Sequence, residues 1–412
     1  MAAATRIQGL FDDRGARAQS SLNLWEGGLT GNANHGLSGN LELAPALTAS
    51  AKQGDFSIID GVADEWRGLC AHGEGVQPFY RPEWIRAYVR AFLPRAKVHL
   101  VTVRRGDDLQ AVLPLVAVRE SFCGLPCMKL RSPVKGHAFR FDMTCAAGER
   151  ETAIAAVWRE LCFQRDWQIL EFRNVLPGAA VERLLELASS EGYPTASVPL
   201  HASPYVALGN DPAILAKLPR NARLRTKLRQ VARNVGGQGL RLRRIEQADP
   251  DALKRFYELE AQGWKGREGS AISSSAESRQ FFDEVAGQAE RFGYLCLYLL
   301  ECGDGVLAGH FGLSYAGRYF SPKVAFDESR KNWMGGHLIV SQILQDCLER
   351  GISEYDITGS DDEWKMKWTS DVRPARMLLI FQNNSLGRIL HAWQFRAKPL
   401  IKRMLGGQPR TS

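Results

Sequence analysis

The residues best suited to chemistry in this chain are the acidic run Asp361-Asp362-Glu363 and a lysine that follows it, Lys365. Carboxylates can take a proton from a reacting group, and an ammonium group can bind an anionic one. The run follows a strand-like stretch, Glu354–Thr358, and loops beyond strand ends bring ligands to catalytic groups in layered α/β folds. We therefore predict Asp361 and Asp362 as candidate bases and Lys365 as a substrate-binding residue. The alternative is a solvated loop or a helix start, where carboxylates favour the helix dipole.

Asp356 is a third candidate base, because it lies inside that strand-like stretch between Tyr355 and Ile357. A carboxylate in a strand is expected to be partly buried and hydrogen-bonded, and burial raises the pKa of a carboxyl group. This position predicts a catalytic carboxylate with a raised pKa, with a structural capping role as the alternative.

Two adjacent glycines, Gly335 and Gly336, precede a predicted helix over His337–Arg350. Backbone N–H groups at a helix N-terminus bind anions, and glycine lets a ligand approach the backbone closely. The preceding segment adds a cation, Lys331, and an aromatic side chain, Trp333. We predict that these residues and His337 bind an anionic cofactor, with an ordinary helix-opening turn as the alternative.

Trp264 and Lys265 stand between two glycines, after a predicted helix. An aromatic ring beside a cation could line a site for a sugar or an anionic substrate, whereas a tryptophan that closes the domain's edge would look the same in sequence. His310, by contrast, alternates with Phe311 in a predicted strand and is expected to be a structural histidine. The chain shows no nucleophile triad and no Walker sequence, and its cysteine spacings do not fit a zinc site, so we predict no bound metal.

The chain divides into regions of different composition. We predict a flexible N-terminal segment over residues 1–54, an N-terminal domain over 55–208, a basic helical connector over 209–240, a C-terminal domain over 241–385 and a basic amphipathic tail over 386–412. The first segment is rich in Gly, Asn, Ser and Ala and has no lasting hydrophobic period. Such a segment buries too little apolar surface to offset the entropy of ordering it.

The connector has one apolar stripe at helical spacing, surrounded by cations. The stripe is Leu224, Leu228, Val231 and Val235, and the cations are Arg220, Arg223, Arg225, Lys227, Arg229 and Arg233. A helix that packs through its stripe and leaves a solvated basic face is one interpretation. The other is that the basic face binds a phosphate-bearing ligand or an acidic polymer. No aromatic residues alternate with the cations, so this pattern does not indicate nucleic-acid binding.

Both domains mix strand and helix patterns, which predicts an α/β or α+β fold with mixed sheets. In the N-terminal domain, Val98–Arg104 and Leu109–Val118 read as a hairpin, with helices over Glu149–Arg165 and Ala180–Glu191. In the C-terminal domain, tight turns predict an antiparallel meander of three strands, Tyr294–Cys302, Val306–Tyr315 and Arg318–Asp327. The helix at His337 and the strands Glu354–Thr358 and Ala375–Gln382 follow. Meander, glycine turn, helix and two strands is the order of an N-acyltransferase domain of the GNAT type.

An ordered set of motifs carries a resemblance to a family. It consists of Trp264-Lys265-Gly266, Gly335-Gly336-His337-Leu338, Tyr355-Asp356-Ile357-Thr358-Gly359, Lys365 and Trp368, preceded by Phe79, Trp84, Leu113-Pro114-Leu115 and Asp142. From about Phe79 to Phe381 the chain resembles CelD-type acetyltransferases, bacterial proteins with a BioF-like acetyltransferase domain that are related to the FemAB peptidyltransferases. The resemblance implies two tandem GNAT-like folds, with the acyl-donor site in the second.

The resemblance implies transfer of an acetyl or other acyl group from acyl-CoA to an amine or hydroxyl acceptor, with a connection to cellulose or exopolysaccharide synthesis. Two alternatives stay open. A FemAB-like enzyme would take its acyl group from aminoacyl-tRNA and would use the basic connector. A non-catalytic tandem-GNAT scaffold of a polysaccharide-synthesis complex would need no donor, and residues 331–336 lack the Arg/Gln-x-x-Gly-x-Gly/Ala pattern of the common GNAT phosphate loop.

The composition is that of a globular protein, with 45% hydrophobic and 24% charged residues and a formal charge of +8. No apolar run approaches the roughly 20 residues that span a membrane. The N-terminus carries acidic residues where a signal peptide is apolar, and the eight cysteines are scattered, so we expect a reduced, cytoplasmic protein. The tail spaces Ile389, Leu390 and Trp393 among cations, which predicts either packing across the parent domain or peripheral contact with a membrane.

Overall fold

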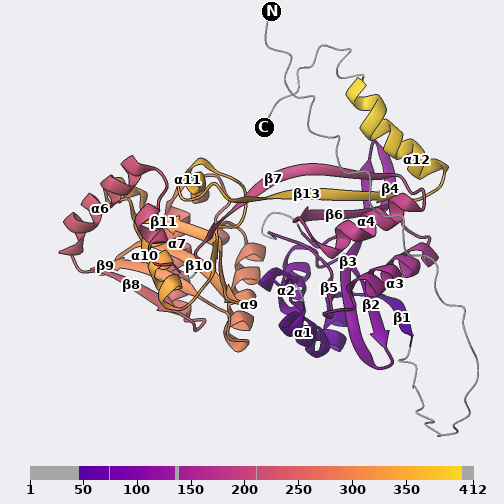
Figure 1. Cartoon of the computed structure of the whole chain (residues 1–412), viewed down its shortest axis with the longest axis horizontal. Coiled ribbons are helices and arrows are strands. Elements are labelled where there is room, and N and C mark those ends of the chain that lie inside the picture. Colours follow the sequence, from indigo (N-terminus) through magenta and orange to yellow (C-terminus); the bar gives the residue numbers. More distant parts are fainter. Residues whose placement is uncertain (1–45, 74, 135–138, 210, 304, 401–412) are drawn as a thin grey trace, which may run out of the picture. The chain divides into compact units, whose positions relative to one another are not determined.

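The computed structural model describes residues 46–400, apart from residues 74, 135–138, 210 and 304. Strands in this part of the chain form one continuous path of hydrogen-bonded neighbours, in the order β1-β2-β3-β4-β6-β13-β7-β12-β11-β10-β9-β8. Figure 1 shows β7 (Thr195–Ala207) and β13 (Val372–Phe381) as long strands that run side by side. The pairing changes along β7: its first ten residues pair with β13, and its last three pair with β12 (Glu354–Asp356). β7 therefore joins an N-terminal sheet to a C-terminal sheet.

The N-terminal sheet begins at β1 (Leu47–Gly54), which pairs antiparallel with β2 (Lys97–Arg105). Residues 47–54 were predicted to be flexible; instead their backbone is paired along its whole length. The rest of the predicted flexible segment, residues 1–45, lies outside the described residues. The hairpin that the sequence predicts is present as β2 and β3 (Asp108–Phe122), joined at Arg105 and Asp108.

The remaining elements of the N-terminal half follow the predicted alternation. They are the 3-10 turns η1 (Phe56–Val62) and η2 (Pro78–Tyr80), helices α1 (Ala63–His72), α2 (Pro82–Phe92), α3 (Arg150–Phe163) and α4 (Ala180–Ser190), and strands β4 (Leu125–Arg131), β5 (Thr144–Cys145) and β6 (Ile169–Val175). α4 begins where the partly buried Asp142 carboxylate accepts the backbone N–H groups of Ala180 and Val181, at 2.9 and 3.1 Å. Those bonds satisfy two of the donors that a helix N-terminus leaves without an intrahelical acceptor.

The predicted meander forms the centre of the C-terminal sheet. β9 (Leu297–Cys302), β10 (Gly305–Tyr315) and β11 (Arg318–Phe326) pair antiparallel, and β8 (Leu240–Ile245) adds an edge strand beside β9. β12 runs parallel to β11, but it pairs only as far as Phe320. The second half of β11 therefore continues beyond its ladder with β12, which leaves room for side chains and ligands on that side.

The C-terminal half of the chain also contains helices, of which the last packs on the N-terminal sheet through Leu390. They are α5 (Ile214–Lys217), α6 (Ala222–Gly236), α7 (Pro250–Gln262), α8 (Trp264–Arg267), α9 (Ala276–Arg291), α10 (Gly335–Glu349), α11 (Glu363–Met366) and α12 (Ser385–Ala392), with the 3-10 turns η3 (Ile272–Ser274) and η4 (Glu328–Trp333) and a π-helical turn, η5 (Trp393–Ala397). The predicted connector helix is α6, and its Leu228 and Val235 are buried in a core cluster with α10 and β9. It is thus packed by its stripe.

The last strand does not belong to the sheet in which it was predicted. β13 was predicted to complete the C-terminal domain, yet it pairs with β6 and β7 in the N-terminal sheet. The largest core cluster also combines both halves, since Phe281 of α9 packs edge-to-face on Trp84 of α2 with ring centroids 5.1 Å apart. Burial of apolar surface is the main driving force of folding, so the two halves are stabilised together.

Candidate functional site

A cavity of about 540 Å³ opens beside the second half of β11. Its walls come from several elements and the residues beside them. They are Leu259 and Glu260 of α7, Trp264 and Lys265 of α8, Val324 to Phe326 of β11, Asp327, Glu328, Arg330 and Lys331 before and in η4, Met334 to His337 at the start of α10, and Asp362 and Trp364 beside and in α11, with Gly263 and His310. Residues predicted from three separate stretches of sequence thus meet at one place. The cavity has the size of a ligand pocket, and its walls are mostly apolar with a few polar groups.

The start of α10 forms one wall. Met334 precedes the helix in the left-handed conformation, and the first bonds of this end run from the N–H groups of His337 and Leu338 to the Met334 carbonyl. The amides of Gly335 and Gly336 come before that ladder. A Cβ on Gly335 would lie 2.8 Å from Leu307 Cγ, so that glycine lets α10 pack against β10. A Cβ on Gly336 would instead lie 3.2 Å from Phe326, a cavity residue, so this glycine keeps the helix end open toward the cavity.

His337 has a defined hydrogen-bonding state. The indole N–H of Trp368 donates to His337 Nδ1 at 3.1 Å. Because an indole nitrogen can only donate, Nδ1 must be unprotonated, and the proton of the neutral ring is on Nε2. Burial, aided by the Lys367 charge, lowers the pKa of His337, which favours this neutral form. His337 therefore offers an N–H donor on a ring that lines the cavity.

Lys331 and Trp333 were both predicted for the anion site. Lys331 is exposed and lines the cavity, whereas Trp333 does not line it. Trp333 packs at the margin of the second core cluster, with the Arg330 guanidinium 5.3 Å from its ring centroid. The ring thus holds Arg330, itself a cavity residue, against the turn. The predicted anion site therefore has two cations, Arg330 and Lys331, beside the α10 N-terminus.

The acidic run separates into two kinds of residue. Asp362 lines the cavity, whereas Asp361 does not. Asp362 accepts hydrogen bonds from Lys365 Nζ and Ser360 Oγ, each at 2.9 Å. Lys365 also donates to the carbonyls of Thr358 and Ser360, at 3.0 and 2.8 Å, and burial lowers the pKa of its ammonium group. With those three acceptors and 8% exposure, Lys365 fixes the loop that carries Asp362 rather than facing the cavity.

Trp264 and Lys265 lie in a one-turn helix, not in the predicted loop. Trp264 is 46% exposed at the cavity, so its ring is accessible. Lys265 is largely buried and donates to Glu260 Oε1 at 2.9 Å and to the Val324 carbonyl at 2.6 Å. The bond to Val324 gives a hydrogen-bond donor to a backbone carbonyl of β11. Val324 lies beyond the part of β11 that pairs with β12.

Glu260, whose side chain is completely buried, is a cavity residue that the sequence analysis did not predict. Besides Lys265, it accepts the Ile272 N–H at 2.8 Å and lies 3.6 Å from Lys323 Nζ. Burial lowers the pKa of Lys323 to about 8. Glu260 lies on the buried, otherwise apolar face of α7. A charged residue on that face is the one feature of the sequence that could have indicated it.

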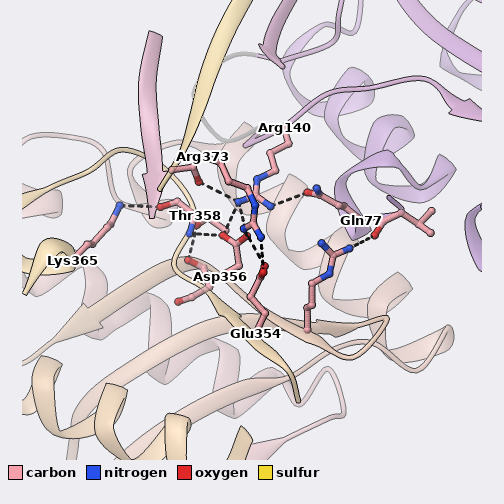
Figure 2. Close-up of polar contacts among 11 residues, drawn as sticks. Gln77, Arg140, Glu354, Asp356, Thr358, Lys365 and Arg373 are labelled. Carbon is pink, nitrogen blue, oxygen red and sulfur yellow. Dashed lines mark hydrogen bonds and ion pairs between the residues drawn. The ribbon is translucent and has the colours of Figure 1, made fainter. Parts of the chain in front are cut away.

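Asp356 is fully buried and does not line the cavity. Figure 2 shows Arg140 and Arg373 converging on it. Arg140 Nη2 lies 2.5 Å from Oδ2 and 2.7 Å from Oδ1, and Arg373 Nη1 lies 3.4 Å from Oδ2. Asp356 Oδ1 also accepts the N–H of Thr358, whose φ of +57° is in the left-handed region. This arrangement is that of a structural carboxylate, the alternative that its position in the strand allowed.

Arg140 comes from the N-terminal half, so this ion pair links the halves. Its guanidinium also donates to Gln77 and Ser203. Thr358, held by Asp356, offers its carbonyl to Lys365 (Figure 2). Lys365 in turn forms an ion pair with Asp362. A continuous set of polar contacts therefore runs from Arg140 to the cavity.

His310 is a cavity residue that the sequence favoured as structural. It is buried, and its Nδ1 lies 3.0 Å from Ser321 Oγ and 3.4 Å from the Tyr355 hydroxyl. Burial, with a smaller contribution from the Lys265 charge, lowers its pKa to about 3, so the imidazole is neutral near pH 7. Among the residues that the structure describes, no group of three or more His, Cys, Asp or Glu could hold a metal ion.

Comparison with known proteins adds three findings. Residues 222–366 match the acetyltransferase (GNAT) domain family. The fold is similar to that of FemX, with a TM-score of 0.56 and 12% identity over 80% of this chain and 98% of FemX. Lower scores relate the chain to L-PGS from Bacillus licheniformis (0.46, 13% identity, 80% of this chain and 98% of that one) and to a tandem GNAT protein from the clavulanic acid biosynthesis pathway (0.44, 14%, 81% and 98%). Comparison with curated proteins found no match.

Proposed function

We propose that the chain is an acyltransferase that takes its acyl group from a coenzyme A thioester, because residues 222–366 match the acetyltransferase (GNAT) domain family and the fold is similar to that of FemX. The observation that carries this proposal is the meeting of the α10 N-terminus with Asp362 in one cavity. The start of α10 offers groups that bind an anion, and the loop before α11 offers a carboxylate for the acceptor.

The chemistry of the donor fits the α10 wall. Coenzyme A carries a pyrophosphate, and amides at a helix N-terminus bind such groups with help from the helix dipole. Gly336 leaves these amides accessible, while Arg330 and Lys331 bring positive charge. These residues would hold the pyrophosphate although the sequence departs from the common phosphate loop. The Nε2–H of His337 would donate to an oxygen or sulfur of the bound thioester.

Asp362 is the residue that we propose takes the acceptor's proton. It is the member of the acidic run that lines the cavity, and Lys365 and Ser360 fix its orientation. A positioned carboxylate contributes about 10²–10⁴-fold to such a reaction. The exposed face of Trp264 suits a sugar ring, which supports an amine or hydroxyl acceptor linked to a saccharide. This acceptor chemistry supports our proposal of a role in polysaccharide synthesis, and we expect the reaction to take place in the cytoplasm.

A second candidate donor is aminoacyl-tRNA, and α6 favours it. Four cations of α6 are exposed: Arg223, Lys227, Arg229 and Arg233. α6 contacts both α10 and η4, so this basic face lies close to elements that line the cavity. A polyanion on α6 would gain affinity from these charges and lose it as salt is added.

A free-thiol assay with acetyl-CoA and a panel of amines and amino sugars tests the proposal. We expect acceptor-dependent thiol release, reduced about 10²–10⁴-fold in Asp362→Asn and unchanged in Asp361→Asn. Release equal to buffer across the panel, together with aminoacyl transfer from charged tRNA, would favour the second donor. Absence of both reactions would favour the non-catalytic scaffold. Full activity in Asp362→Asn would remove this carboxylate as the base.

A further inference from the structure

The helix that follows β13 exposes an apolar stripe. Leu386, Ile389 and Trp393 follow one another at spacings of three and four, so they share a face of the helix. Their exposed fractions are 40%, 61% and 47%, and Leu400 beyond η5 is 53% exposed. Nine large hydrophobic side chains are exposed in the described part of the chain, and these are four of them. Single exposed apolar residues are ordinary, but a cluster on one element indicates an interaction surface.

This stripe is not the face by which the helix packs on the protein. Leu390 is 1% exposed and lies in a small core cluster with Cys127, Ile169 and Phe381, under the end of the N-terminal sheet. On the same side, His391 Nε2 lies 3.0 Å from the Thr195 carbonyl. The helix is therefore anchored by one face, and a second apolar face is left toward solvent.

The charge around the stripe has one sign. Arg388, Arg396 and Lys398 are all exposed. In the sequence, residues 372–412 contain eight Lys or Arg and no Asp or Glu, so the formal charge of this segment is +8. The formal charge of the whole chain is also +8. The preceding 371 residues thus have no net charge, and the positive charge of the protein belongs to the segment that presents the stripe.

We propose that α12 and η5 dock on the surface of a membrane with anionic lipids. The stripe of Leu386, Ile389, Trp393 and Leu400 would enter the boundary between headgroups and acyl chains, and the neighbouring cations would contact the headgroups. No helix among the described residues combines the length and apolarity needed to cross a bilayer.

Charge complementarity selects this occupant over a second copy of the chain. A symmetric dimer through the stripe would bring the same surface of each copy together and would oppose Arg388 and Arg396 to their own equivalents. An anionic bilayer instead neutralises them. The proposal does not depend on which acyl donor the cavity binds.

Vesicle sedimentation tests the proposal with the full chain. Vesicles of phosphatidylcholine with 30% phosphatidylglycerol are compared with phosphatidylcholine alone, at low and high salt. We expect binding to the anionic vesicles, reduced by about tenfold or more in Ile389→Ser/Trp393→Ser, which removes two of the stripe's side chains. Arg388→Gln/Arg396→Gln should lose a similar factor on anionic vesicles, since each basic residue near such a surface gives roughly fivefold in affinity.

Matched controls are Phe163→Ser and Arg159→Gln on α3. Phe163 is 84% exposed and Arg159 is exposed, but neither belongs to the stripe. Both should bind vesicles as the unmodified protein does, and thermal melting should give the same midpoint for every variant used. The proposal is overturned if the unmodified protein does not sediment, if the stripe variant binds equally well, or if Phe163→Ser loses as much. A dimer that dissociates in the stripe variant would assign the surface to a second copy instead.

Discussion

Replacing Asp356 by Asn tests the structural role of the buried ion pair between the two halves. Asn keeps the size of the side chain and can still accept the Thr358 N–H, but it removes the charge that Arg140 and Arg373 contact. Arg373 keeps Glu354 as a partner at the edge of the network, whereas Arg140 is 1% exposed and keeps only the neutral Gln77 and Ser203.

The expected cost follows from that difference in burial. Removing one partner of a buried pair leaves an uncompensated charge and costs about 3–5 kcal/mol. With an unfolding entropy of about 2.1 cal/mol/K per residue over roughly 350 residues, the midpoint of thermal unfolding should fall by about 4–7 °C. Asp64→Asn is the matched control, since Asp64 is 95% exposed in its ion pair with Arg67 and such pairs are worth about 0–1 kcal/mol.

Thermal melting followed by circular dichroism measures both variants. The double variant Asp356→Asn/Arg140→Met should recover part of the loss, because it leaves no buried guanidinium without a counter-charge. If the melting temperatures of Asp356→Asn and Asp64→Asn differed by less than about 1 °C, the Arg140–Asp356 pair would not contribute the stability that its burial implies. A stable Asp356→Asn protein with abolished turnover would return Asp356 to the catalytic role that the sequence predicted.

Three further predictions concern the cavity. Trp368→Phe removes the hydrogen-bond donor to His337 Nδ1, so the imidazole of His337 can carry its proton on either nitrogen. We expect calorimetry to show about five- to tenfold weaker binding of acetyl-CoA. Unchanged binding would contradict the assigned tautomer. The pKa of Lys323 is about 8 in the folded protein, below its value in the unfolded chain, so the free energy of unfolding should decrease as pH falls from about 10.5 to 8. In urea denaturation, this decrease should be about 2–3 kcal/mol larger for the unmodified protein than for Lys323→Met. Parallel pH profiles of the two proteins would refute the prediction. Lys365→Met frees the loop of Asp362, so steady-state kinetics should show kcat falling before the acceptor KM rises, and the reverse order would make Lys365 a substrate ligand.

Much of the fold could be predicted because it depends on local patterns. Period-two hydrophobicity and tight turns identified the β2–β3 hairpin and the meander of β9, β10 and β11. Helical spacing identified α6 and α10, and the predicted bounds of α10 lie within two residues of the observed ones. The strand partners of β13 could not be predicted in this way, because an apolar run says that a strand is buried but not which sheet receives it.

The site shows the same division. Glycines before a helix and an acidic loop after a strand are visible in the sequence, and the structure brings Gly336, His337 and Asp362 to one cavity. The difference between Asp361 and Asp362 depends on which side chain turns toward the cavity, which a run of like residues does not encode. The pairing of Asp356 with Arg140 joins residues 216 positions apart, and no local pattern records such a contact.

Calorimetric titration of the full chain with acetyl-CoA tests the central claim, that the α10 wall binds the acyl donor. We predict saturable binding by the unmodified protein and about tenfold weaker binding, roughly 1.4 kcal/mol, by Gly336→Val, whose side chain would stand against Phe326 and cover the amides. Gly68→Val, at a helix position with open space around its Cβ, should bind as the unmodified protein does. No heat of binding from the unmodified protein, or equal affinity in a folded Gly336→Val variant, would contradict this assignment of the donor site.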